Sequence, residues 1–124
     1  MLDIGMEFRK GILFVRLKGV LNGDTSIQLD NELTSTIDNN GIRYLSINLS
    51  ELESIDKYGM KVLMKNYLNI RKQDGKVMIC GLDKLLNYNG MLLNNLYKIP
   101  DEMKAFEVIN IWKQKKNLHF YMIN

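Results

Sequence analysis

The chain has 124 residues, of which 46% are hydrophobic and 25% are charged, and its net charge is +3. These values predict one folded domain, spanning residues 1–124, and argue against an intrinsically disordered chain. The basic excess is small and the lysines and arginines are scattered along the sequence, so we do not expect nucleic acid as a partner.

The N-terminus carries no basic segment followed by an apolar run, so it does not resemble a signal peptide. No window approaches the roughly 20 apolar residues that a membrane span requires. We therefore expect a cytoplasmic protein that does not insert into a membrane. The single cysteine, Cys80, lies in an apolar run and is predicted to be a small buried hydrophobic residue.

The first part of the chain predicts two strands and a helix. Strands are expected over 5–9 and 12–18, joined by a turn at Lys10 and Gly11, with alternating apolar residues on one face of the second strand. A loop over 21–25 follows, in which Asp24 or Thr25 can cap a helix that runs to about residue 39. The buried stripe of this helix is predicted to be Leu29, Leu33 and Ile37.

The middle of the chain predicts a strand over 44–49 and a long helix from about Tyr58 to Asp74. Asp56 suits the cap at the start of this helix, and Gly75 is expected to end it. The buried side of the helix is predicted to consist of Met60, Leu63, Met64, Tyr67 and Ile70.

The last part predicts a strand over 76–82, a weak helix over 84–89 capped by Asp83, a short edge strand over 97–99, and a final helix over 102–115. Strands joined through helices imply crossover connections and a mixed sheet. The expected fold is therefore α/β, with about five strands and four helices mainly on one face.

No set of catalytic residues is visible in the sequence. The only histidine, His119, lies near the C-terminus, and the sequence contains no paired cysteine motif, nucleophile elbow or phosphate-binding loop. We therefore expect neither an enzyme nor a bound cofactor or metal.

The segment 54–59, SIDKYG, places a lysine where a helix start prefers acidic or hydroxyl side chains. Lys57 is either tolerated because the site is exposed or used by a partner. Gly59 indicates the close approach of another part of the chain or of a partner. Lys57, Lys61, Lys65 and Lys72 fall on one side of the helix, as a solvated face or as a ridge that contacts an acidic partner.

Four stretches together resemble the STAS domain family of anti-sigma factor antagonists and their relatives. They are VRLKGVL at 15–21 followed by Thr25, IRYLSINL at 42–49, IDKYG at 55–59, and NLYKI at 95–99. The resemblance covers about residues 5–112 and leaves 113–124 as an extension. It implies a small α/β domain that binds a protein partner, typically a kinase-like anti-sigma factor, and performs no catalysis.

In this family the partner phosphorylates the first serine of an Asp-Ser-Ser-Gly motif, and the added charge breaks the complex. Here that position is Lys57 and the next is Tyr58, so the resemblance implies that the usual switch is missing. The residues expected to bind the partner are Asn22, Asp24, Thr25, Asp56, Lys57, Tyr58, Gly59 and Lys61.

Three other functions remain open from the sequence. The domain could serve as an accessory part of a transporter or lipid-trafficking complex, or it could bind a small ligand. It could also self-associate through the C-terminal extension 113–124, whose apolar residues suit an extra strand or a contact with a second copy; alternatively the extension folds onto its own domain.

Overall fold

A computed structural model describes residues 1–85 and 96–123 of the chain, without the side chains of Lys84 and of 118–123. The weak helix expected over 84–89 lies almost entirely outside the described residues. A short 3-10 helix, Leu82–Lys84, stands just before it.

The five described strands form one mixed sheet whose order follows the chain: β1 (Leu2–Arg9), β2 (Ile12–Leu21), β3 (Tyr44–Ile55), β4 (Lys76–Cys80) and β5 (Tyr97–Lys98). β1 and β2 are antiparallel, and every later neighbour pair is parallel. The predicted turn at Lys10 and Gly11 is confirmed, and both residues have left-handed φ angles of 51° and 84°. Such a two-residue turn matches the twist of the strands it joins.

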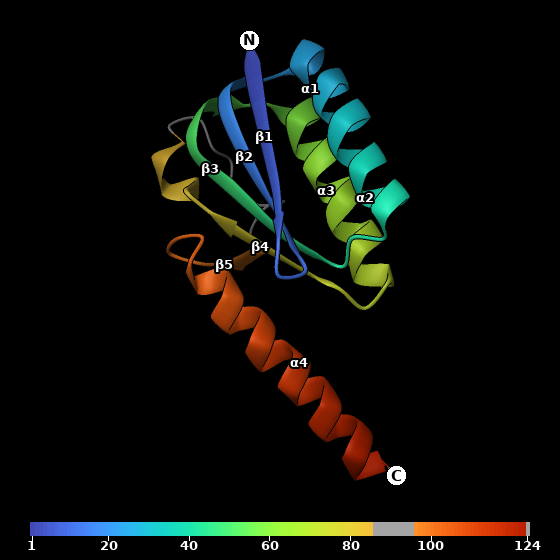
Figure 1. Ribbon diagram of the computed structural model, residues 1–124. Helices are drawn as coiled ribbons and strands as arrows, with labels where there is room; N and C mark the ends of the chain where they lie inside the picture. The colour runs from blue at the N-terminus through green and yellow to red at the C-terminus, as the bar shows by residue number, and fades with distance from the viewer. Residues whose placement is uncertain (86–95, 124) are drawn as a thin grey trace.

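One face of the sheet is covered by two parallel helical segments (Figure 1). The first runs without a break through α1 (Gly23–Leu29), a π-helical segment (Asp30–Thr34) and α2 (Ser35–Asn40), and the second is α3 (Lys57–Lys72). The predicted stripe of the first segment is confirmed, since Leu29, Leu33 and Ile37 are at most 1% exposed. These side chains join the inward residues of the central strands in the main core.

The last helix, α4 (Lys104–Ile123), begins against the opposite face of the sheet and then projects beyond it (Figure 1). Its Ala105, Val108 and Ile109 pack with Ile12 and Phe14 of β2 in a second core. The prediction that the helices lie mainly on one face is confirmed, with α4 as the exception. The second face of β2 is apolar at its start, so it also needs cover.

The C-terminal extension does not form the extra strand considered above. Helix α4 continues to Ile123, eight residues past the predicted end at Lys115. The residues that follow Trp112, KQKK, are good helix formers with no glycine or proline among them.

The end of α3 also differs from the prediction. The helix ends at Lys72, and Asp74, not Gly75, adopts the left-handed conformation with φ of 64°. Gly75 is required for another reason: a Cβ at this position would lie 2.1 Å from the carbonyl oxygen of Arg43 at the entrance to β3.

Candidate functional site

Two helices begin next to each other at one end of the sheet (Figure 1). Because β2 and β3 are parallel, the chain leaves both strands at the same end of the sheet and enters α1 and α3 there. The backbone N–H of Asp56 donates to the carbonyl of Leu21 at 3.1 Å and ties the two helix entrances together. This end of the sheet contains both segments that were expected to contact a partner.

Asn22 caps α1, and not Asp24 or Thr25 as predicted. Its side-chain oxygen accepts hydrogen bonds from the backbone N–H groups of Asp24 at 3.0 Å and Thr25 at 3.1 Å. The Thr25 hydroxyl accepts from the Asn22 N–H at 2.8 Å and donates to the carbonyl of Val20 at 2.8 Å. These contacts satisfy the otherwise unpaired groups of the first turn and direct the Thr25 hydroxyl inward.

Asp56 caps α3 as predicted. Its Oδ1 accepts from the backbone N–H groups of Tyr58 and Gly59, both at 3.0 Å. Gly59 is buried, and a Cβ there would lie 2.4 Å from Cγ of Leu21 and 3.3 Å from Cγ1 of Ile55. The close approach that Gly59 indicated therefore comes from within the fold.

The exposed part of this end of the molecule is centred on Tyr58, which is 48% exposed. Its ring lies against Gly23, where a Cβ would be 3.6 Å from Cδ2 of the tyrosine. The ammonium groups of Lys57 and Lys61 lie 5.2 Å and 5.6 Å from the ring centroid. Neither lysine forms an ion pair with another described residue, so two unneutralised cations flank one exposed aromatic ring.

Ile27 is an exposed residue that the sequence analysis missed. It is 64% exposed and lies one turn after Gly23, on the same side of α1. The available signal was an isoleucine placed off the buried stripe of Leu29 and Leu33. Together Tyr58, Lys57, Lys61 and Ile27 define what we call the docking surface.

Below the docking surface, side chains pair across the two helices in parallel register. The pairs are Lys65 Nζ to Asp30 Oδ1 at 2.9 Å, Asn66 Nδ2 to Thr34 Oγ1 at 3.1 Å, and Asn69 Nδ2 to Asp38 Oδ1 at 2.9 Å. The hydrogen bonds from Thr34 and Lys65 lower the pKa of Asp30. The exposed Lys65 is thus paired with Asp30 of the same molecule, and of the predicted lysine ridge only Lys57 and Lys61 lie on the docking surface.

The eight residues expected to bind a partner differ in what they expose. Asp24, Lys57, Tyr58 and Lys61 are exposed, Asn22, Thr25 and Asp56 are partly buried, and Gly59 is buried. All eight lie at the two helix starts. The exposed members are accessible at the surface, whereas Asn22, Thr25 and Asp56 form the hydrogen bonds of the two caps and Gly59 packs inside.

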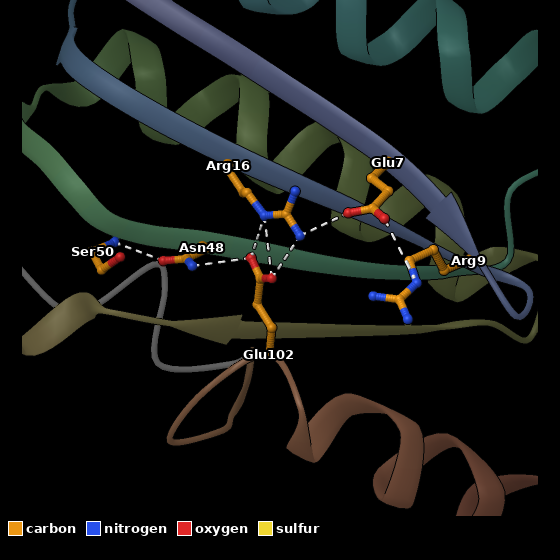
Figure 2. A network of polar contacts seen from close by, with 6 residues as sticks. All are labelled: Glu7, Arg9, Arg16, Asn48, Ser50 and Glu102. Carbon is orange, nitrogen blue, oxygen red and sulfur yellow. Dashed lines mark hydrogen bonds and ion pairs between the residues drawn. The ribbon is translucent and has the colours of Figure 1, made fainter.

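A second polar cluster lies on the sheet face that α4 begins to cover (Figure 2). Arg16 donates to both carboxylate oxygens of Glu102, at 2.8 Å and 2.9 Å, and to Glu7 at 3.0 Å, while Asn48 donates to Glu102 at 3.0 Å. The Arg16 guanidinium lowers the pKa of Glu102. Arg9 lies 3.6 Å from Glu7, so two arginines balance two carboxylates, and the cluster fixes the chain entering α4 and offers little to a charged ligand.

The described residues contain no obvious chemical centre. No group of three or more His, Cys, Asp or Glu among them could hold a metal ion. Cys80 is buried as predicted, and burial raises the pKa of its thiol to about 11, which keeps it protonated and unreactive near neutral pH. No helix in the described part of the chain is long and apolar enough to cross a membrane.

Comparison with known proteins identifies a family for this chain. The family model of the STAS domain matches residues 3–87. An anti-sigma F factor antagonist from Paenibacillus polymyxa is 28% identical over 94 residues, which cover 73% of this chain and 80% of that protein.

Solved structures agree at the level of the fold. An anti-sigma factor antagonist from Mycobacterium paratuberculosis has a TM-score of 0.75 at 18% identity, covering 89% of this chain and 95% of the other. The anti-sigma factor antagonist SpoIIAA in its unphosphorylated form has a TM-score of 0.68 at 13% identity, covering 87% and 98%.

Proposed function

The chain belongs to the STAS domain family, and on that premise we propose that it is a non-catalytic protein-interaction module that acts like an anti-sigma factor antagonist. The partner proposed from the relatives is an anti-sigma factor, of the kinase-like type that such antagonists bind. It docks on the surface around Tyr58, where the two helix starts meet.

One observation carries this proposal: Lys57 and Lys61 flank the exposed ring of Tyr58, and neither forms an ion pair with a carboxylate among the described residues. An exposed aromatic ring supplies contact area, and two cations supply attraction for an acidic patch. Lys57 is also the first residue of α3, where the helix dipole disfavours a positive charge. The lysine gains nothing from its own helix, which favours a role in contact with a partner.

The position of Lys57 also bears on regulation. In the resemblance described above it takes the place of the phosphoacceptor serine. A lysine cannot accept a phosphoryl group as a serine does, and its charge is opposite to that of phosphoserine. We therefore propose that binding through this surface is not controlled by phosphorylation at position 57.

The test begins with affinity capture from the lysate of the source organism, followed by identification of the captured protein. The purified partner is then titrated with wild type, Lys57→Glu and Lys72→Glu. Lys72 is the matched control, because it is exposed on the same helix but lies at its other end. We expect Lys57→Glu to weaken binding about tenfold or more and Lys72→Glu to change it less than about twofold.

Equal effects of the two substitutions would contradict a specific role for Lys57. Capture of a transporter or lipid-trafficking subunit in place of an anti-sigma factor would favour the accessory-domain alternative. Self-association through 113–124 stays a prediction, and size-exclusion chromatography with and without residues 117–124 tests it separately.

A further inference from the structure

A hollow of about 490 Å³ lies at the other end of α3, away from the docking surface. Its walls come from α3, β4, β5 and α4 and include Tyr67, Arg71, Lys76, Tyr97 and Trp112. This volume falls within the usual range of small-molecule sites, roughly 300–1,000 Å³. Residues that are far apart in the sequence therefore meet around one concave space.

Lys76 is the central cation of this hollow. Its ammonium group lies 4.5 Å from the ring centroid of Tyr97 and 4.7 Å from that of Trp112. The residue is half-buried, and burial together with the nearby charge of Lys115 lowers its pKa. No carboxylate among the described residues forms an ion pair with it, so the charge is partly desolvated and not neutralised.

Arg71 supplies a second cation at the same hollow. Its guanidinium donates a hydrogen bond to the Tyr67 hydroxyl at 3.2 Å. The central carbon of the guanidinium lies 6.0 Å from the centroid of the Tyr67 ring. None of the described residues that line the hollow is acidic. Asp74, which precedes Gly75 of this hollow, is paired with Lys116, and Glu107, which lies in the adjoining hollow beside Lys76 and Trp112, is paired with Lys104. Two cations thus share one aromatic-walled space without a counter-ion of their own.

We propose that this hollow binds a small organic anion that carries a planar ring. The carboxylate or phosphate of the ligand pairs with Lys76 and Arg71, and its ring packs against the side chains of Tyr67 and Tyr97. An anion neutralises the charge of a partly desolvated ammonium. A guanidinium binds a carboxylate or a phosphate through two parallel hydrogen bonds. Aryl carboxylates and nucleoside monophosphates share this chemistry. The proposal is independent of the docking surface.

The chain offers a built-in probe, because Trp112 is its only tryptophan. The full-length protein is titrated with AMP, benzoate, inorganic phosphate and benzyl alcohol, and Trp112 fluorescence is followed, with calorimetry as a second readout. We expect saturable binding of AMP or benzoate and weaker binding of the probes that lack the ring or the charge. The stronger of the two ring-bearing anions identifies whether a nucleoside monophosphate or an aryl carboxylate is the better ligand.

Three variants test which side chains are responsible. Lys76→Met and Arg71→Met are each expected to weaken binding about tenfold, as the loss of one charged hydrogen bond implies. Lys72→Met is the matched control, since Lys72 follows Arg71 on α3 but does not line the hollow. Circular dichroism of each variant verifies that it is folded, and calorimetry reports binding even where the environment of Trp112 has changed.

Several results would overturn the proposal. These are no saturable binding of either ring-bearing anion, inorganic phosphate binding as tightly as AMP, or binding that survives both Lys76→Met and Arg71→Met. An equal loss in Lys72→Met would mean that the general positive charge, and not this hollow, attracts the ligand.

Discussion

The two ends of α3 both present positive charge, but they present it in different forms. At the start, Lys57 and Lys61 stand on an exposed surface beside one tyrosine ring. At the other end, Lys76 lies between two aromatic rings in a concave space that Arg71 also lines. An exposed cation suits a large partner that brings its own surface, whereas a recessed cation suits a ligand small enough to enter.

The difference extends to how each end is built. The start of α3 depends on side chains that satisfy free backbone groups, with Asp56 bonded to two N–H groups. The far end depends on the close packing of backbone segments, with Gly75 against the carbonyl of Arg43. The loss of a helix cap costs a modest amount of free energy, and a steric conflict with the backbone costs more. Mutations at the two ends should therefore differ clearly in how far they lower the free energy of unfolding.

The largest effect is expected from Gly75→Ala. The new Cβ would lie 2.1 Å from the carbonyl oxygen of Arg43, which accepts the hydrogen bond of the Lys76 N–H at 2.9 Å. The strand entrance must move, and we expect the free energy of unfolding to fall by about 3 kcal/mol. Urea unfolding followed by circular dichroism measures it.

Gly59→Ala is the matched variant at the start of α3. Its Cβ would meet side chains of Leu21 and Ile55, which can adjust in part, and alanine favours the helix by about 1 kcal/mol. A loss at Gly59 as large as that at Gly75 would show that both ends are equally rigid and would remove the contrast.

The next effect is expected from Asp56→Ala. Two backbone N–H groups lose their acceptor, and the free energy of unfolding should fall by about 1 kcal/mol. Asp24→Ala is the control, because Asp24 is an exposed acid in the first turn of α1 whose carboxylate caps nothing. Chemical denaturation of both variants decides the point, and equal losses would mean that charge near the helix start matters more than the cap.

The smallest effect concerns the ion pair between Lys65 and Asp30, midway along α3. The folded-state pKa of Asp30 is lowered, so its stabilisation is present above the ordinary pKa of 3.8 and is lost as the pH falls through the folded value. Both side chains are more than a third exposed, so Lys65→Met should cost only about 0.5 kcal/mol or less near neutral pH.

The contribution of this ion pair to the free energy of unfolding is compared at two pH values. Unfolding of wild type and Lys65→Met is measured near neutral pH and again well below pH 3.8, where the difference should shrink. A difference that stays constant would assign the effect to packing of the lysine side chain and not to its charge.

Local patterns in the sequence predicted much of the fold. The stripe of Leu29, Leu33 and Ile37 and the cap at Asp56 were correct because each depends on spacing within one element. The cap at Asn22 was missed because Asn22, Asp24 and Thr25 are all capping residue types. Which of them caps depends on where β2 delivers the chain.

The hollow was beyond sequence reasoning for a related cause. Tyr67, Lys76, Tyr97 and Trp112 share no local period, and they meet only because parallel strands and two helices bring four elements to one corner of the sheet. The opposite placement of α4 was missed because the alternation of β2 was assigned a single well-buried face, although Ile12 and Phe14 make the other face apolar at its start.

The parallel pairing of β2 and β3 has a consequence for the order in which the molecule assembles. β1 and β2 are joined by two residues and can pair within microseconds, whereas β2 and β3 can pair only after residues 22–43 have folded back. The docking surface lies at the ends of this later pair. A chain still emerging from the ribosome therefore has its hairpin before the two helix starts of the proposed docking surface come together.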